Sequence, residues 1–239
     1  MIRFLRGGYG VSLAPRFVLH LLVLLFSCAV YAGNNDIYLT QTGTGLTLTI
    51  DQIGATNKVG TSQARVTLSG TSMTVDIDQI GDTNTFAATV AQGNSSSWTY
   101  KATGDSNTAA ITVGGTGDSA ATDFDFEATG DSNVLTFTQG DSATATSGNQ
   151  DFVVTGTSNN INAKCNVVGC INNWTVSGNS NDIDTLQSGR QDHDITVVLT
   201  GSSNDVDVDQ TDTASTNVAN IISTTTTGTI NIDQCASGC

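Results

Sequence analysis

The fold is decided by the stretch Met73-Thr-Val-Asp-Ile-Asp-Gln-Ile-Gly-Asp-Thr-Asn-Thr-Phe-Ala-Ala-Thr-Val90. Before Gly81, apolar residues and Gln79 alternate with Thr and Asp, and a second alternation runs from Asn84 to Val90. Period-two alternation sends one set of side chains inward and the other to water, which is typical of a half-buried β-strand. The glycine and its polar neighbours therefore predict a tight turn between two short strands.

This turn recurs along the chain as the pattern Gly-x-[Ser/Thr]-Asn. Seven copies start at intervals of 22 to 27 residues, at Gly54, Gly81, Gly104, Gly130, Gly156, Gly178 and Gly201. A two-strand unit with one apolar face cannot bury that face alone, whereas stacked units close a continuous core. We therefore predict an all-β, single-domain β-solenoid of two-strand rungs, with seven or eight repeats over residues 41–234.

The aromatic residues and the composition support the same fold. The sequence has 25 glycines and a single proline, with abundant Thr, Ser, Asn and Asp, which favour strands and turns over helices. Large aromatic side chains should all take the inward register if one phase holds through every repeat. The residues that do so are Phe86, Trp98, Tyr100, Phe124, Phe126, Phe137, Phe152 and Trp174.

Amide side chains share the inward register with the apolar residues. A buried amide is costly unless it is hydrogen-bonded, and stacked rungs about 4.8 Å apart let each amide bond to its equivalents above and below. We therefore expect stacking ladders built from Gln52, Asn57, Gln63, Gln79, Asn84, Gln92, Asn107, Asn133, Gln139, Asn159, Asn181, Asn204 and Gln210.

The N-terminus has the layout of a secretory signal peptide. Three arginines precede or flank an apolar run at residues 17–26, which ends in small residues before Ala32. We expect cleavage after Ala32, although Cys28 offers a lipid-anchoring alternative. The mature chain would then start with a short segment, residues 33–40, and contain no transmembrane segment, because no later stretch is long and apolar enough.

Charge and cysteine content narrow the function classes. Cleavage removes three basic residues and no acid, which changes the net charge from −14 to −17. So acidic a chain repels nucleic acid and anionic lipid. Four cysteines remain in two close pairs, and in an oxidising compartment they favour disulfides. The spacing suggests Cys165–Cys170 and Cys235–Cys239, the second closing a loop over residues 235–239, and leaves other connectivities open. Zinc is disfavoured because the Cys-x2-Cys spacing and a nearby histidine are lacking.

Catalytic and metal-binding motifs are weak. The only histidine outside the signal peptide, His193, lies between two aspartates, and we expect it to be exposed in a turn. With no nucleophile or phosphate-loop motif, the sequence favours a protein that is not an enzyme and needs no cofactor. Asp205, Asp207, Asp209 and Asp212 share one outer face, where a hard cation could bridge them, but a solvated acidic face is the simpler interpretation.

The first repeats resemble a known family. Gln52-Ile-Gly54-Ala-Thr-Asn57-Lys-Val59-Gly-Thr-Ser-Gln63 is similar to the curlin repeat, Gln-x-Gly-x-x-Asn-x-Ala followed by Gln after three residues. Gln79-Ile-Gly81-Asp-Thr-Asn84 follows the first half of the pattern, with Gln92 as a late closing residue. The similarity is specific in these two units and diffuse over the rest of residues 41–234.

The resemblance implies a subunit of a curli-like functional amyloid. Such proteins leave a Gram-negative cell through the periplasm and an outer-membrane export pore, with a chaperone and a nucleator as partners. They self-associate end to end into adhesive fibres of the biofilm matrix. The alternative is a capped, monomeric β-solenoid that acts as an adhesin or matrix-binding surface protein, with the Cys235–Cys239 loop as its cap.

Overall fold

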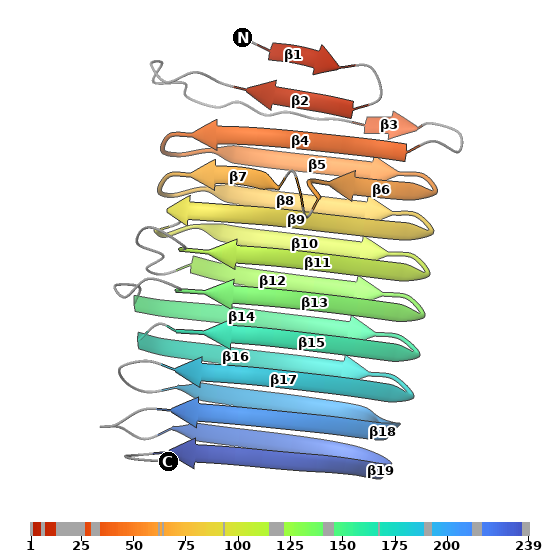
Figure 1. The fold of residues 1–239 in the computed structure, drawn as a ribbon, viewed down its shortest axis with the longest axis vertical. Helices are drawn as coiled ribbons and strands as arrows, with labels where there is room; N and C mark the ends of the chain where they lie inside the picture. Colours follow the sequence, from red (N-terminus) through yellow and green to blue (C-terminus); the bar gives the residue numbers. More distant parts are fainter. Residues whose placement is uncertain are drawn as a thin grey trace.

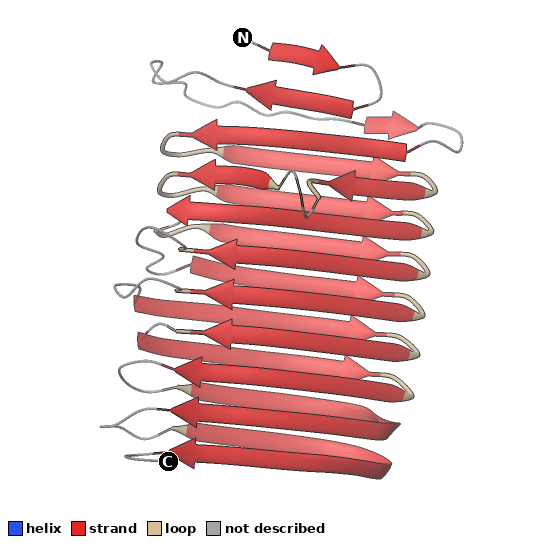
Figure 2. Cartoon of the chain, viewed as in Figure 1, coloured by secondary structure: helices blue, strands red, loops and turns tan. Residues whose placement is uncertain are grey.

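The structure is a computed structural model. It describes residues 2–5, 8–12, 27–29, 34–61, 63, 65–92, 94–114, 122–140, 146–166, 168–188, 193–211 and 217–235. Every regular element in these ranges is a β-strand (Figure 2). The described part of the chain therefore offers no helix that could cross a membrane.

The strands coil into a β-solenoid with two parallel sheets, which confirms the predicted fold class (Figure 1). We call the sheet drawn nearer the viewer the front sheet and the fainter one the rear sheet. The rear sheet contains β5 (Thr47–Ile53), β8 (Thr74–Ile80), β10 (Ser97–Thr103), β12 (Thr122–Thr129), β14 (Thr146–Thr155) and β16 (Val168–Ser177).

The front sheet runs alongside in the opposite strand direction. Its members are β4 (Asn34–Thr42), β6 (Thr56–Val59), β7 (Val66–Ser69), β9 (Thr83–Gln92), β11 (Ser106–Val113), β13 (Ser132–Gln139), β15 (Ser158–Cys165) and β17 (Ser180–Ser188). The long strands β18 (Asp194–Thr211) and β19 (Val218–Cys235) pass through both sheets, first half rear and second half front. One rear strand and the front strand that follows it form one rung.

The N-terminal strands lie inside the predicted signal peptide. β1 (Ile2–Leu5) and β2 (Gly8–Ser12) form an antiparallel pair, while β2 pairs with β4 and β3 (Ser27–Ala29) pairs with β5. Signal-peptide cleavage itself stays a prediction. The solenoid begins earlier than the expected residue 41, because β4 starts at Asn34 and pairs with β6 and β7.

The recurring glycine turn joins each rear strand to the next front strand. The amide of each turn glycine donates to a carbonyl one rung further on, as from Gly104 to Thr129 at 3.0 Å. A Cβ added at Gly104 would lie 1.7 Å from the carbonyl oxygen of Gly81. Only glycine therefore lets the turns stack this closely.

The core lies between the two sheets. All eight aromatic residues placed inward from the sequence are at most 1% exposed, so that prediction is confirmed. Their rings contact one another across rungs, from Phe86 and Tyr100 (centroids 4.9 Å apart) to Phe152 and Trp174 (5.1 Å). The aromatic side chains thus tie successive rungs together as well as the two sheets.

Candidate stacking surface

An unbroken column of asparagines runs along the turn edge of the front sheet. Each asparagine takes the first inward position after a turn. From Asn35 to Asn181, each donates its amide to the Oδ1 atom of the asparagine one rung on, at 2.7–3.1 Å, and Asn204 donates to the Ser223 hydroxyl. Most also donate to turn carbonyls, as Asn133 does to Gly130 and Thr155. The column contains Asn35, Asn57, Asn84, Asn107, Asn133, Asn159, Asn181 and Asn204.

A short glutamine column lies at the end of the first rear strands. Gln79 donates to the Oε1 atom of Gln52 at 2.7 Å, and both side chains are buried. The next residue in the column is Ala102, whose small side chain leaves room for the Tyr100 hydroxyl to donate to Gln79 at 2.8 Å. Burial raises the pKa of this phenol, which keeps it a proton donor. The column therefore ends in a satisfied amide.

A second glutamine column lies in the front sheet, at the edge opposite the turns. Gln210 donates to Gln187 and Gln234 donates to Gln210, both at 2.6 Å. Gln139 stands in the same column, but Cys165 separates it from Gln187 and it accepts instead from Gln150 at 3.1 Å. The two columns share one polarity, because each glutamine that bonds to the next donates toward the N-terminal rung.

The structure forms the expected disulfide between Cys165 and Cys170. It closes the connection from β15 to β16 with both sulfurs buried, and the Cα atoms are 6.4 Å apart. The disulfide thus occupies the core position that Gln139 and Gln187 fill in neighbouring rungs. The Cys235–Cys239 pair lies outside the described residues, apart from the backbone of Cys235 at the end of β19.

The prediction that Gln63 joins an inward ladder is wrong. Val59 pairs with Phe86 and Val66 pairs with Ala88, so the chain from Gly60 to Arg65 is an insertion opposite a single residue. Gly60 takes a φ of +71° and turns the chain outward, which leaves Gln63 exposed. The side chain of Gln92 lies outside the described residues, although its backbone ends β9.

His193 also departs from its expected exposed position. It is fully buried just before β18, and its backbone amide donates to Oδ1 of Asn217 in the next rung at 3.4 Å. It continues an inward column in which Cys170 occupies the preceding rung. His193 is therefore a core residue of the solenoid.

Sequence reasoning missed several amides of the columns. Asn35 lies 22 residues before Asn57, an interval that the later repeats also use. Gln187 and Gln234 lie six residues after the first inward position of their strands, as Gln139 and Gln210 do. Counting one repeat back from Asn57 would have found Asn35. Counting six residues forward from Asn181 and from Gly228 would have found Gln187 and Gln234.

The outer faces carry the acidic residues in two separate areas. On the rear sheet they lie between β5 and β14, where Asp51 is in register with Asp78 and Asp125 with Asp151. On the front sheet they lie in the last rungs, where Asp182 is in register with Asp205 and Asp184 with Asp207. Neutral amides flank these pairs, as Asn160 donates to Asp182 at 2.8 Å and Asn231 to Asp207 at 3.1 Å.

Packing of the carboxylates changes their titration. Partial burial, followed by repulsion from Asp182 and Asp207, raises the pKa of Asp184. Partial burial, followed by repulsion from the aspartates nearest to each, also raises the pKa of Asp78, Asp125 and Asp209. Among the described residues no three His, Cys, Asp or Glu side chains converge as metal ligands would. Asp212 of the expected cation face lies outside the described residues.

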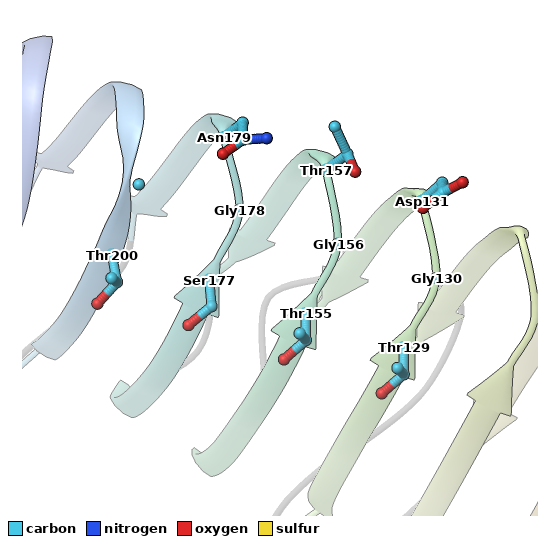
Figure 3. A pocket seen from close by; sticks show the side chains of 11 residues that line it. Thr129, Gly130, Asp131, Thr155, Gly156, Thr157, Ser177, Gly178, Asn179 and Thr200 are labelled. Carbon is cyan, nitrogen blue, oxygen red and sulfur yellow. The ribbon is translucent and has the colours of Figure 1, made fainter.

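A shallow groove follows the turn column (Figure 3). Its volume is about 520 Å³, its floor is formed by Gly130, Gly156 and Gly178, and one wall is a row of hydroxyl side chains. In register, that row contains Thr129, Thr155, Ser177 and Thr200. The lining offers one carboxylate, Asp131, and no histidine or lysine, so it lacks the paired acid and base of a hydrolytic site.

The last rung is the feature most unlike the rest of the molecule. In β19, Ile230 and Ile232 take the inward register but are 45% and 42% exposed, whereas their equivalents Val206 and Val208 in β18 are fully buried. Gln234 completes the same inward set and donates to Gln210. As the last strand that the structure describes, β19 therefore presents core side chains and a strand edge.

Comparison of the chain with protein-family models, with curated proteins and with solved structures found no match.

Proposed function

We propose that this chain is an exported structural protein that assembles end to end into extracellular β-stacked fibres. The observation that carries the proposal is the last rung, because β19 repeats the interior pattern of the solenoid with no further described strand beside it. Ile230 and Ile232 are the side chains that a following rung would cover. An unprotected parallel edge of this kind is a template for another strand.

Removal of residues 1–32 would create the complementary end. β2 and β3 pair with β4 and β5, so cleavage after Ala32 would bare the edges of both solenoid strands. Ile37 and Leu39 in β4 would then lie exposed, as Ile230 and Ile232 do. A mature subunit would thus have a free edge at each end, which linear polymerisation requires.

The front glutamine column would extend the same bonding across each junction. Gln234 is the last member of this column and can bond to an amide of the next subunit, as Gln210 does with Gln187 within the chain. The acidic outer faces would repel neighbouring fibres and so favour growth along the axis over lateral clumping. Both features support a fibre whose strands stack in register.

The biological setting that we propose follows the curlin resemblance. The subunit would cross the periplasm and the outer membrane of a Gram-negative bacterium, helped by a chaperone, an export pore and a nucleator. Its fibres would serve adhesion and the biofilm matrix. Catalysis, a cofactor and nucleic-acid binding have no place in this role.

Assembly of purified protein that starts at Gly33 tests the proposal. We expect thioflavin-positive, SDS-resistant fibres. Ile230→Lys should abolish them, because a junction would bury an unpaired ammonium. Thr229→Lys, on the outer side of the same strand, should leave assembly intact.

The two lysine variants separate assembly from folding. Position 230 is half-exposed in the single chain, so both variants should retain the far-UV circular dichroism and melting temperature of the parent. A parent protein that stays a soluble monomer for days at high concentration would contradict the proposal and favour the capped adhesin. Equal assembly of the two variants would show that β19 is not the junction.

A further inference from the structure

The two sheets of the mature solenoid do not hold the same number of strands. The front sheet starts at β4 and the rear sheet starts at β5, which follows β4 in the chain. At the other end, β19 contributes one segment to each sheet, rear segment first. Without residues 1–32, the part of the solenoid that the structure describes therefore begins and ends with a front strand and contains an odd number of half-turns.

This imbalance restricts how one subunit can follow another. If the next subunit were only shifted along the axis, its β4 would pair with the front part of β19. Its β5 would then lie two strand spacings, about 9.6 Å, from the rear part of β19, because adjacent strands are about 4.8 Å apart. One rear strand would be missing at every junction, and its backbone groups would lack partners.

A half-turn about the fibre axis removes the gap. Rotation by about 180° places β4 of the next subunit against the rear part of β19, and β5 against the front part. Front strands run opposite to rear strands, so the same rotation makes each new pair parallel, as every pair from β4 onward is within the chain. Both sheets then continue without a missing strand.

We propose that successive subunits of the fibre are related by a half-turn, so that the front sheet of one subunit continues as the rear sheet of the next. The proposal rests on the end-to-end assembly proposed above and specifies its junction. The partner is a second copy of this chain, and the surfaces are the edge of β19 and the edges of β4 and β5.

The side chains at the rotated junction match position by position. Leu46, the buried residue just before β5, is equivalent to Gly228 of β19. Counting inward positions from these two residues places Leu48 against Ile230, Ile50 against Ile232 and Gln52 against Gln234. Within the chain, Gln79 donates to Gln52 and Gln234 donates to Gln210, so a glutamine of the next subunit that kept this polarity would donate to Gln234. The amide column would cross the junction with its direction unchanged.

The other half of the junction is equally apolar at its centre. The rear part of β19 presents Ala219 and Ile221 inward, and β4 presents Ile37 and Leu39 at the equivalent positions. Burial of these aliphatic side chains away from water would stabilise the junction. The half-turn therefore pairs apolar with apolar side chains in both sheets, and amide with amide where Gln52 meets Gln234.

Cysteine pairs on the outer face distinguish the two junctions. With the half-turn, Asn231 of one subunit lies beside Thr49 of the next, whereas a simple shift places it beside Tyr38. In-register neighbours about 4.8 Å apart have Cα separations that suit a disulfide. We would oxidise fibres of the variants Asn231→Cys/Thr49→Cys and Asn231→Cys/Tyr38→Cys, and identify the linked residues by peptide mass mapping.

We expect intermolecular links between positions 231 and 49, and a ladder of covalent oligomers, from the first variant, and none from the second. The variant Asn231→Cys/Asp207→Cys is the control for oxidation, because this in-register pair should link within one chain. Fibres that link through position 38, or through neither position, would overturn the half-turn and leave fibre formation standing. Absence of fibres in the parent protein would instead overturn the proposed function, and the half-turn with it.

Discussion

The two edges of the solenoid follow different rules. At the turn edge, asparagine occupies the first inward position of every front strand from Asn35 to Asn204, and the turns are short and alike. At the opposite edge, the last inward position of the front strands holds Leu68, Val113, Gln139 or Cys165, and the connections vary in length. The register of the whole coil is thus set at one edge, which leaves the other free to vary.

The contrast has a structural cause in the reach of the side chains. The carboxamide of asparagine is short, so from its position beside the turn it bonds to the turn carbonyls and to the next asparagine together, as Asn107 does with Gly104, Thr129 and Asn133. Some glutamines at the far edge also bond to backbone carbonyls, as Gln210 does with His193 and Val218, whereas Gln139 accepts a bond from Gln150. Loss of Asn133 therefore disturbs two turns, whereas loss of Gln139 disturbs one bond.

The largest expected effect comes from a methyl group at the turn edge. Gly104→Ala should destabilise the protein by more than about 3 kcal/mol, because the new Cβ would overlap the backbone carbonyl of Gly81 and force two rungs apart. Urea unfolding followed by circular dichroism measures the change.

The matched control is Gly169→Ala at the opposite edge, where φ is +69° but nothing lies within 4 Å of the new Cβ. It should cost only about 1 kcal/mol of backbone strain. Equal losses would contradict the difference between the edges.

Two substitutions in one strand compare the amides directly. Asn133→Leu in β13 should cost roughly 2–3 kcal/mol, because it leaves the carbonyl of Thr155 and the amides of its column neighbours short of partners. Gln139→Met, at the other end of β13, should cost less than about 1 kcal/mol, since Gln139 accepts one bond and apolar residues fill its column elsewhere. The same urea experiment measures both, and a larger loss for Gln139→Met would reverse the assignment of the edges.

The disulfide is expected to matter less than an asparagine of the column. Cys165→Ala/Cys170→Ala removes the disulfide, which closes a short loop with a sequence separation of 5. A loop of this length should contribute about 2 kcal/mol to the free energy of unfolding, because it lowers the chain entropy of the unfolded state. The melting temperature of the double variant, compared with that of the parent under oxidising conditions, measures the loss. An unchanged melting temperature would show that side-chain packing at this edge, and not the disulfide, holds β15 against β16.

Period two and the glycine turns made most of the fold predictable. The inward register of residues such as Trp98 and Phe137 follows from alternation alone, because a strand offers only two faces. The asparagine column was predictable for the same reason, since every member sits at a fixed offset from a turn glycine. Local rules suffice wherever the rung has no extra residues.

The positions that were predicted wrongly depend on where inserted residues interrupt the strand pairing. Gln63 has the right offset from Asn57, but the chain departs at Gly60 and returns only at Val66, so counting by two fails between them. The signal was present, because the interval from Gly54 to Gly81 is longer than the interval that follows it. His193 was misplaced for a related reason: its acidic neighbours in sequence suggest a turn, whereas its column neighbour Cys170 places it in the core.

The smallest expected effect concerns the acidic faces, which lie between the edges. The pKa values of Asp78, Asp125, Asp184 and Asp209 are raised by partial burial and by neighbouring carboxylates, so the folded chain binds protons more tightly than the unfolded chain does. Stability should therefore rise as the pH falls from 7 through these raised values toward the ordinary value of 3.8. Melting temperatures across this range measure the rise, and replacing the four aspartates with asparagine should flatten it.

Because the amides at the two edges do not titrate, the difference in stability between Asn133→Leu and Gln139→Met should stay constant over the same pH range. A difference that changes with pH would show that the charged faces, and not the amide columns, distinguish the two edges.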